Sequence, residues 1–322
     1  MRKMRSLLAA TGLLIVLTGS AAAQSDYPNR PIRLIIPFPP GGSNDIVGRA
    51  IATQMGERLG KQMVVDNRTG AGGVVGSELA SKAPADGYTI LVISISHTVN
   101  PWLYKLPYDP IKVFTPVGIM ATGTNVLTVH PSLPAHSVKD LLDMAKAKPG
   151  ELQYASAGVG TFQHLGAELF KLEAKVNLMH IPFRGGGPAL IDVLGGHNKI
   201  MFSSLVQAVP HIKTGRLRAL GTGGKERIPA LAEVPTISEA GVPGYEALNW
   251  WGLLAPAGTP APIIARLHKA LEESQDSPEI QQQFEKEGAA TRKMSAADFG
   301  KFIESEMNKW QRVVKEGGIK AE

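Results

Sequence analysis

The stretch Ile32–Asp45, which reads IRLIIPFPPGGSND, passes from an apolar run into a loop rich in proline and glycine. The apolar run predicts a buried strand, and Ser43 or Asn44 can cap the helix that follows. Along that helix, apolar residues recur at every fourth position from Val47 to Leu59 and form one stripe. A strand, a glycine-rich loop and an amphipathic helix in succession are typical of βα units, so the stretch indicates an α/β fold.

The same alternation of short apolar runs and amphipathic segments continues along the chain and starts afresh after residue 125. Further strands are predicted at 64–65, 88–93, 126–129, 152–155, 177–180, 199–202, 217–220 and 249–254. Further helices are predicted at 72–82, 138–146, 161–172, 188–194, 262–273, 278–286 and 296–315. Because the last strand can return to the first half, we expect the second domain to be inserted into the first.

We therefore predict two α/β lobes joined by a hinge. Residues 24–124 and 248–322 would form a discontinuous first lobe, and residues 125–247 the second lobe. The length supports this division, because roughly 300 residues exceed one ordinary core and suit two domains of about 150. No linker rich in proline, glycine or serine separates the halves, so short crossings near 121–125 and 245–249 predict a hinge and not a tether.

The loop after the first predicted strand is the first candidate ligand site. Its prolines stiffen the entry, and its glycines let the main chain approach a ligand closely. The helix that follows offers unpaired N–H groups and a partial positive charge, which suit a carboxylate or a phosphate. The alternative is a plain strand-to-helix turn capped by Ser43. The candidate ligand-binding residues of this loop are Phe38, Pro40, Gly41, Gly42, Ser43, Asn44 and Asp45.

A second loop of the same kind, YASAGVGTFQH at 154–164, also follows a predicted strand and opens a helix. Its hydroxyl groups and exposed glycine amides suit the same type of ligand. Two such loops at matching points of two βα halves predict the two jaws of a cleft at the carboxyl ends of the strands. The candidate ligand-binding residues of this loop are Ser156, Gly158, Gly160, Thr161 and His164.

Two further segments follow predicted strands. In FRGGGP at 183–188, Arg184 either pairs with a second carboxylate of the ligand, or caps carbonyl groups or lies in solvent. The polar segment 94–100 follows the third strand, so we expect Ser96 at the rim of the cleft. We interpret His97 in the same segment as a rim or turn residue and not as a ligand contact.

Motifs of common enzymes, cofactor sites and metal sites are missing from the sequence. Ser156 lacks the Gly-x-Ser-x-Gly elbow, and the glycine-rich stretches at 70–76 and 221–225 miss the dinucleotide and phosphate-loop spacings. The histidines show no metal-binding spacing, and the chain has no cysteine. The Lys and Arg residues are scattered, which argues against nucleic-acid binding. We therefore expect no cofactor, no metal and no nucleic-acid partner.

The first residues are typical of an export signal. Arg2, Lys3 and Arg5 form a basic start, an apolar run covers 7–17, and Ala21–Ala23 provide small residues for cleavage. Half of the formal net charge of +6 lies in this segment. The apolar run is shorter than the roughly 20 residues that span a bilayer, although a membrane anchor is the alternative. We predict a signal peptide at 1–23, cleavage near Ala23 and a periplasmic location.

Ordered motifs along nearly the whole mature chain resemble one family. They are Tyr27-Pro28 with Pro31-Ile32-Arg33, Asn67-Arg68 with Gly70–Gly73, Asp86-Gly87-Tyr88, Leu106–Pro110, the 154–164 loop, Val234-Pro235-Thr236 and Trp250 with Gly252–Pro260. The chain resembles the extracytoplasmic receptors of tripartite tricarboxylate transporters, known as the Bug family. The resemblance implies a type II periplasmic-binding-protein fold, whose two α/β lobes close on a small solute. It also implies that main-chain amides of the loops at 40–45 and 156–164 hold a ligand carboxylate, with membrane permease subunits as partners.

Two departures from the family pattern concern the far end of the ligand. Phe183 stands where the family usually has tyrosine, and Ser203 with Ser204 stand where it usually has an Asp-Asn pair. We include Ser204 among the candidate ligand-binding residues. The leading hypothesis is a monomeric receptor for a small carboxylate, with no enzymatic activity. The alternatives are a secreted serine hydrolase that uses Ser156 and His164, and a receptor whose output is signalling.

Overall fold

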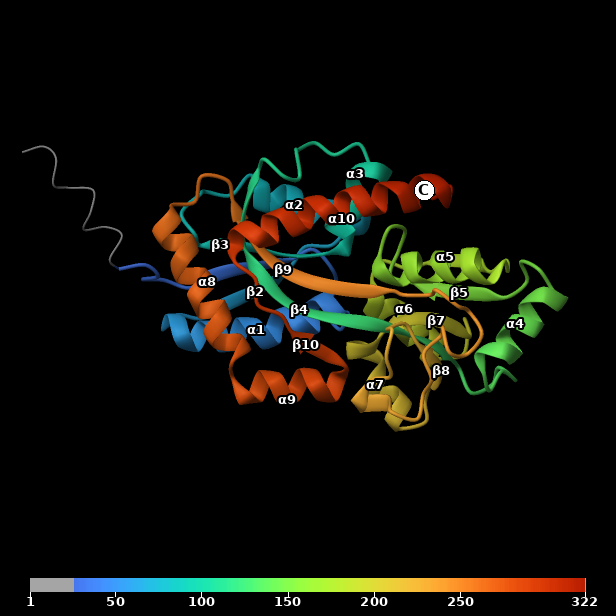
Figure 1. Ribbon diagram of the computed structural model, residues 1–322. Helices are drawn as coiled ribbons and strands as arrows, with labels where there is room; N and C mark the ends of the chain where they lie inside the picture. Colours follow the sequence, from blue (N-terminus) through green and yellow to red (C-terminus); the bar gives the residue numbers. More distant parts are fainter. Residues whose placement is uncertain (1–25, 322) are drawn as a thin grey trace, which may run out of the picture.

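The computed structural model describes residues 26–321, and the predicted signal peptide at 1–23 lies outside the described residues. Two α/β lobes lie side by side, and the long strands β4 (Phe114–Val129) and β9 (Leu248–Pro256) run from one lobe into the other (Figure 1). Within 26–321, no helix has the length and apolar character needed to cross a membrane.

The remaining strands are β1 (Ile32–Ile36), β2 (Met63–Asn67), β3 (Thr89–Ser94), β5 (Gln153–Ser156), β6 (Met179–Pro182), β7 (Ile200–Ser204), β8 (Arg218–Thr222) and β10 (Ala289–Thr291). The helices are α1 (Ser43–Leu59), α2 (Val74–Ser81), α3 (Ile95–Leu103), α4 (Val138–Ala147), α5 (Phe162–Ala174), α6 (Gly186–Leu194), α7 (Leu205–Lys213), α8 (Ala261–Gln275), α9 (Pro278–Glu287) and α10 (Ala296–Glu316). Short 3-10 turns cover Ala71–Gly73 and Pro229–Leu231.

The strands follow one hydrogen-bonded order, β2-β1-β3-β9-β4-β7-β5-β6, with β8 and β10 also paired to β4. The strands β1, β2 and β3 are parallel in one lobe, and β5, β6 and β7 are parallel in the other. Strand β4 changes its pairing partner midway along its length. Thr124 is the last residue of β4 that pairs with β9, and Asn125 is the first that pairs with β7. Parallel strands bring their carboxyl ends, and the loops that follow them, to one edge of each lobe.

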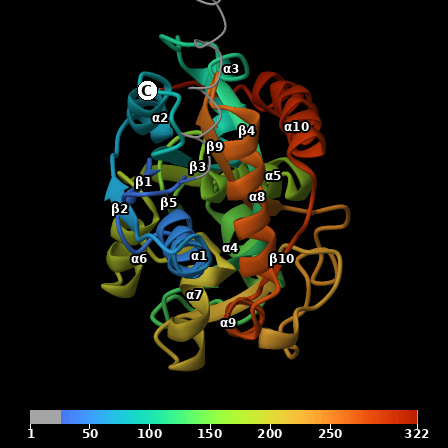
Figure 2. The ribbon, with the colours of Figure 1, turned by 90° about the vertical axis from the view of Figure 1, so that its left-hand side faces the viewer.

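Each lobe has its own apolar core. The stripe of α1 that includes Val47 and Ile51 packs with β1, β3 and α8 in the first lobe, and Tyr154, Phe170 and Phe202 are buried in the second. Figure 2 looks along the molecule from the first lobe, with α8 in front and α10 to the side. Trp310 and Val314 at the far end of α10 belong to one buried cluster with Ile95 and Val99 of α3 and with the apolar core of the second lobe. The C-terminal helix therefore ends at the junction of the two lobes, packed on α3.

The sequence did not predict the helices α3 and α7, the short strand β10 or the first part of β4. Helix α3 contains Pro101 and several β-branched or hydroxyl residues, which have low helix propensity, so its buried contacts determine its form. The first part of β4 contains Pro116, Gly118 and Gly123, and its pairing with β9 shifts register in two places. These irregularities obscure the alternation that identifies a strand.

Candidate functional site

The loop between β1 and α1 is held in place by a buried carboxylate. Asp45 is only 4% exposed, and it accepts hydrogen bonds from the Gly41 N–H at 3.1 Å and from the Asn67 side-chain amide at 2.9 Å. Its other contact is an ion pair with Arg49 at 2.9 Å. All these contacts lie within the first lobe. Asp45 thus fixes the shape of the loop.

The loop between β5 and α5 is fixed by contacts of its own side chains. The Ser156 hydroxyl accepts a hydrogen bond from the Gly158 N–H at 3.0 Å, and the Thr161 hydroxyl donates to the Gly158 carbonyl at 2.6 Å. The Gly160 N–H donates to Nδ1 of His164 at 3.3 Å. Gly158 and Gly160 have φ values of 116° and 75°, which few other residues adopt. The predicted polar residues of this loop therefore mainly define its conformation.

A buried network supports the second loop from behind. The rings of His164 and His180 stack at 4.2 Å between centroids. Tyr154 also stacks with His180, and its hydroxyl donates a hydrogen bond to Glu168. Burial lowers the pKa of His164 to about 4, assisted by the nearby charge of Lys171. Burial and the neighbouring His164 lower the pKa of His180 to about 3. Both imidazoles are therefore neutral at pH 7.

The serine proposed for the hydrolase alternative does not pair with the expected histidine. The Ser156 hydroxyl lies 2.6 Å from Nε2 of His180, and His164 contacts the Gly160 amide instead. Ser156 is 0% exposed. A substrate carbonyl has no access to this hydroxyl in the conformation observed.

The third loop, between β6 and α6, packs directly against the first loop. A Cβ atom on Gly185 would collide with Cγ of Pro39, and one on Gly187 would lie 2.6 Å from the Pro40 carbonyl oxygen. Only hydrogen atoms fit at these two positions, so the backbones of the two lobes are in contact here. The structure is therefore that of a closed cleft.

A small cavity lies where these loops meet. The predicted residues that line it are Phe38, Gly42, Ser43, Asn44, Ser96 and Thr161. It is also lined by residues that the sequence analysis did not select: Ser94, Ala157, Phe162, Gln163, Gly186 and Asn249. None of these twelve side chains is ionisable.

Four helices, α1, α3, α5 and α6, begin at this cavity. Their N-cap residues are Gly42, Ser94, Thr161 and Gly185, and none of these caps forms a side-chain hydrogen bond to its helix. The first-turn N–H groups of a helix have no partner within the helix, and the helix dipole adds a partial positive charge there. The cavity therefore combines converging N–H donors with a positive potential and has no cationic side chain.

The other predicted residues lie outside the cavity. Pro40 and Gly41 are exposed on the outer side of the first loop, and Asp45, Ser156, Gly160 and His164 support the loops. Ser204 is fully buried at the start of α7, beside Asn125 of β4. Arg184 and Gly158 line a neighbouring groove between the lobes, together with the glycine-rich turn at 70–73, and this groove shares Phe38 and Ala157 with the cavity. Arg184 is exposed, and within 26–321 it forms no ion pair.

Two signals for the missed cavity residues were present in the sequence. Phe162 and Gln163 occupy the first turn of a predicted helix, and Gly186 lies in a strand-to-helix loop that was noted only for Arg184. Asn249 had no local signal, because its place depends on how β9 crosses between the lobes.

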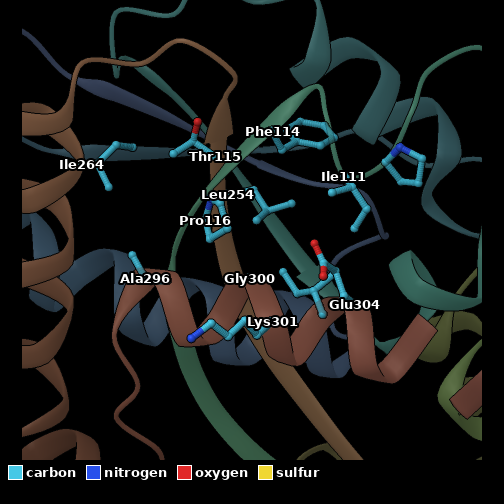
Figure 3. A pocket seen from close by; sticks show the side chains of 13 residues that line it. Ile111, Phe114, Thr115, Pro116, Leu254, Ile264, Ala296, Gly300, Lys301 and Glu304 are labelled. Atoms are coloured by element: carbon cyan, nitrogen blue, oxygen red, sulfur yellow. The ribbon is translucent and has the colours of Figure 1, made fainter. Parts of the chain in front are cut away.

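A larger pocket of about 440 Å³ lies elsewhere, between α10, α8 and the start of β4. Figure 3 shows its mostly apolar walls, among them Ile111, Phe114 and Leu254, with Lys301 and Glu304 at one side. It involves the first lobe alone and none of the three strand-to-helix loops. Within the described chain, no group of His, Asp and Glu side chains is arranged to hold a metal ion.

Two α/β lobes closed over a small cavity define a solute-binding protein of the periplasmic type. The family model described as the tripartite tricarboxylate transporter family receptor matches residues 47–319. "Protein BugT" of Bordetella pertussis is 37% identical over 322 residues, covering 98% of this chain and 99% of that protein. The chain therefore belongs to the receptor family of the tripartite tricarboxylate transporters, and the predicted Bug-type resemblance is confirmed.

Solved structures agree with this assignment. "R. palustris Rpa4515 with adipate" is 36% identical, with a TM-score of 0.89 over 91% of this chain and 99% of that chain. "Structure of periplasmic binding protein BugD" is 30% identical, with a TM-score of 0.88 over 92% of this chain and 100% of that chain. The predicted type II fold of two α/β lobes is thus confirmed, and the family consists of periplasmic solute-binding receptors.

Proposed function

We propose that the small cavity binds one carboxylate of a small molecule through main-chain N–H groups. The observation that carries this proposal is the convergence of α1, α3, α5 and α6 on a cavity lined by no ionisable side chain. An anion is stabilised at helix N-termini, and no cation has to be desolvated there. Rpa4515, a related structure, is described with the dicarboxylate adipate. The protein would hand this solute to the membrane subunits of its transporter.

The position of Gly42 suggests where the carboxylate lies. A Cβ atom on Gly42 would be 3.7 Å from the Gly186 nitrogen and 3.8 Å from the Gly187 nitrogen. Its φ of −83° is open to any residue, so a side chain there would not strain the backbone. A methyl group at this point would stand in front of the amides of α6. A substitution at Gly42 therefore tests access of the ligand without straining the backbone. At Gly158 the φ of 116° would strain any residue with a side chain.

The test is calorimetric titration of a panel of small carboxylates, and of their methyl esters, against the mature protein and Gly42→Val. We expect at least one acid to bind the wild type, its ester to bind at least tenfold more weakly, and Gly42→Val to lose binding. Equal affinities for an acid and its ester would show that no carboxylate is recognised.

We also propose that the lobes are residues 24–124 with 248–322 and residues 125–247, and that they move about the crossings near 121–125 and 245–249. The change of partner in β4 between Thr124 and Asn125 supports this boundary. Small-angle scattering with and without a bound acid should show a smaller radius of gyration in the complex. An unchanged radius would argue against closure, provided that the unliganded protein is open.

Three properties complete the proposal. Cleavage near Ala23 and release into the periplasm are supported by the basic start and small residues of 1–23, and mass spectrometry of periplasmic protein tests them. A monomer is the expected state, and light scattering tests it. The absence of esterase activity is supported by the complete burial of Ser156, and incubation with ester substrates tests it.

A further inference from the structure

The end of the cavity formed by β9 and α1 is polar but uncharged. Asn249 on β9 and Asn44 in the first turn of α1 both line it, and Gln163 enters from α5. Three side-chain amides from three elements thus face one small space. The charged groups near the loops do not line this cavity: Asp45 pairs with Arg49, and Arg184 is exposed and lines the neighbouring groove.

The amide of Asn249 lacks hydrogen-bond partners. Asn249 is 2% exposed, and within 26–321 its side-chain oxygen contacts no donor. The side-chain oxygen of Asn44 is equally buried and unpartnered. Buried amide oxygens without donors are unfavourable, so a ligand group that donates hydrogen bonds would complete this end of the site.

The second end of the ligand must suit these amides. A carboxylate only accepts hydrogen bonds and would bring a second negative charge into a cavity with no cation. A carboxamide or a hydroxyl both donates and accepts, as the amides of Asn44, Gln163 and Asn249 do. The space between the closed loops is small, so the ligand that they enclose is small as well.

Resting on the carboxylate site proposed above, we propose that the preferred ligand is a small monocarboxylate with a neutral hydrogen-bonding group at its other end. The monoamide of a short dicarboxylic acid represents this class. Asn249 is then a residue that determines specificity, because its amide recognises the neutral group.

The test compares compounds of nearly the same shape by calorimetric titration: succinate, succinamate and succinamide, with the corresponding sets of five and six carbons. We expect a half-amide to bind at least tenfold more tightly than the dicarboxylate of the same length. Equal or tighter binding of the dicarboxylate would overturn the inference and leave the carboxylate site standing. Equal binding of the diamide and the half-amide would instead overturn the carboxylate site. Failure of all nine compounds to bind would overturn the proposed ligand class.

Variants of Asn249 connect the preference to this residue. Asn249→Leu keeps the size of the side chain but removes the amide, so the preference for the half-amide should fall to less than threefold. Asn198→Ala is the matched control, because Asn198 also has a buried side-chain oxygen without a hydrogen-bond partner. Asn198 precedes β7 and lies at the end of that strand that is away from the cavity. Its preference should equal that of the wild type. An unchanged preference in Asn249→Leu, with thermal unfolding like that of the wild type, would exclude Asn249 as the recognising group.

Discussion

Alanine at Gly187 should prevent the lobes from closing while leaving each lobe intact. Gly187 is the second residue of α6 and has an ordinary helical backbone, where alanine is as good as glycine or better. Alanine also keeps the main-chain N–H. In the closed structure, however, its Cβ would lie 2.6 Å from the Pro40 carbonyl oxygen on the opposite lobe. The substitution therefore acts on closure and not on the fold of α6.

The expected magnitude follows from the geometry of the loop contact. Relieving a 2.6 Å contact to an ordinary separation requires the loops to part by somewhat less than about 1 Å. A hydrogen bond of about 2.9 Å across the cleft then lengthens beyond its useful range. One hydrogen bond to a charged group contributes about 1.5–3 kcal/mol, so its loss weakens Kd by roughly ten- to a hundredfold.

The assay is calorimetric titration with an acid that binds the wild type, combined with small-angle scattering of the free and bound forms. Gly300→Ala is the control, because a Cβ there lies 3.3 Å from Cγ of Pro116 within the first lobe. The control should bind and close like the wild type. If Gly187→Ala also binds and closes like the wild type, the contact between the first and third loops does not belong to the bound state.

Three further variants test other parts of the site. Asp45→Asn replaces one of the two acceptor oxygens by an NH2 group, so either the Gly41 N–H or the donors of Arg49 and Asn67 lose their acceptor; urea unfolding should show a loss of about 1–2 kcal/mol and titration should show a weaker Kd. Burial lowers the pKa of His97 to about 4 in the folded protein, whereas the ordinary value of 6.5 applies in the unfolded chain. Between these pH values the unfolded chain binds the proton and the folded protein does not, so the free energy of unfolding should fall as the pH drops from about 6.5 to 4. His97→Gln keeps a donor for the Pro110 carbonyl and should remove about 3 kcal/mol of that pH dependence, measured by urea unfolding at both ends of the range. Arg184→Ala should change Kd by no more than a factor of about two and the free energy of unfolding by no more than about 0.5 kcal/mol, because the side chain is exposed. A large loss of binding would show that Arg184 contacts the ligand.

The elements that the sequence predicted are those whose own pattern determines them. The apolar run of β1 and the stripe of α1 are local signals, and both lie within a residue or two of the predicted bounds. Helix α3 was not predicted because its sequence, ISHTVNPWL, favours helix only weakly, and contacts with α10 and β3 hold it. Strand β4 was predicted for only its last four residues because proline and glycine interrupt the rest.

The residues of the candidate site also divide into those with a local sequence signal and those that distant contacts place. The loop at 38–45 could be recognised locally, since a glycine-rich turn before a helix is an anion site in many folds. The polar residues of the two loops were harder to assign, because Asp45 in the first loop and His164 in the second differ from cavity residues only in the direction of their side chains. That direction is set by distant partners such as Asn67. Asn249, on a strand 200 residues away from the loop, reaches the cavity only through the pairing of β9 with β3 and β4.

The distribution of the four helix N-termini accounts for how a small anion can control closure. Helices α1 and α3 precede the first crossing of the chain between the lobes, and α5 and α6 follow it, so an open cleft offers an anion only half of the donors. A ligand shifts the equilibrium by its differential contacts with the two states. Two additional hydrogen bonds to a charged group contribute about 3–6 kcal/mol, and about 5.5 kcal/mol moves an equilibrium from 1:99 to 99:1. Main-chain donors therefore suffice for closure, and a cleft without an ion pair can reopen without leaving a buried side-chain charge unpaired.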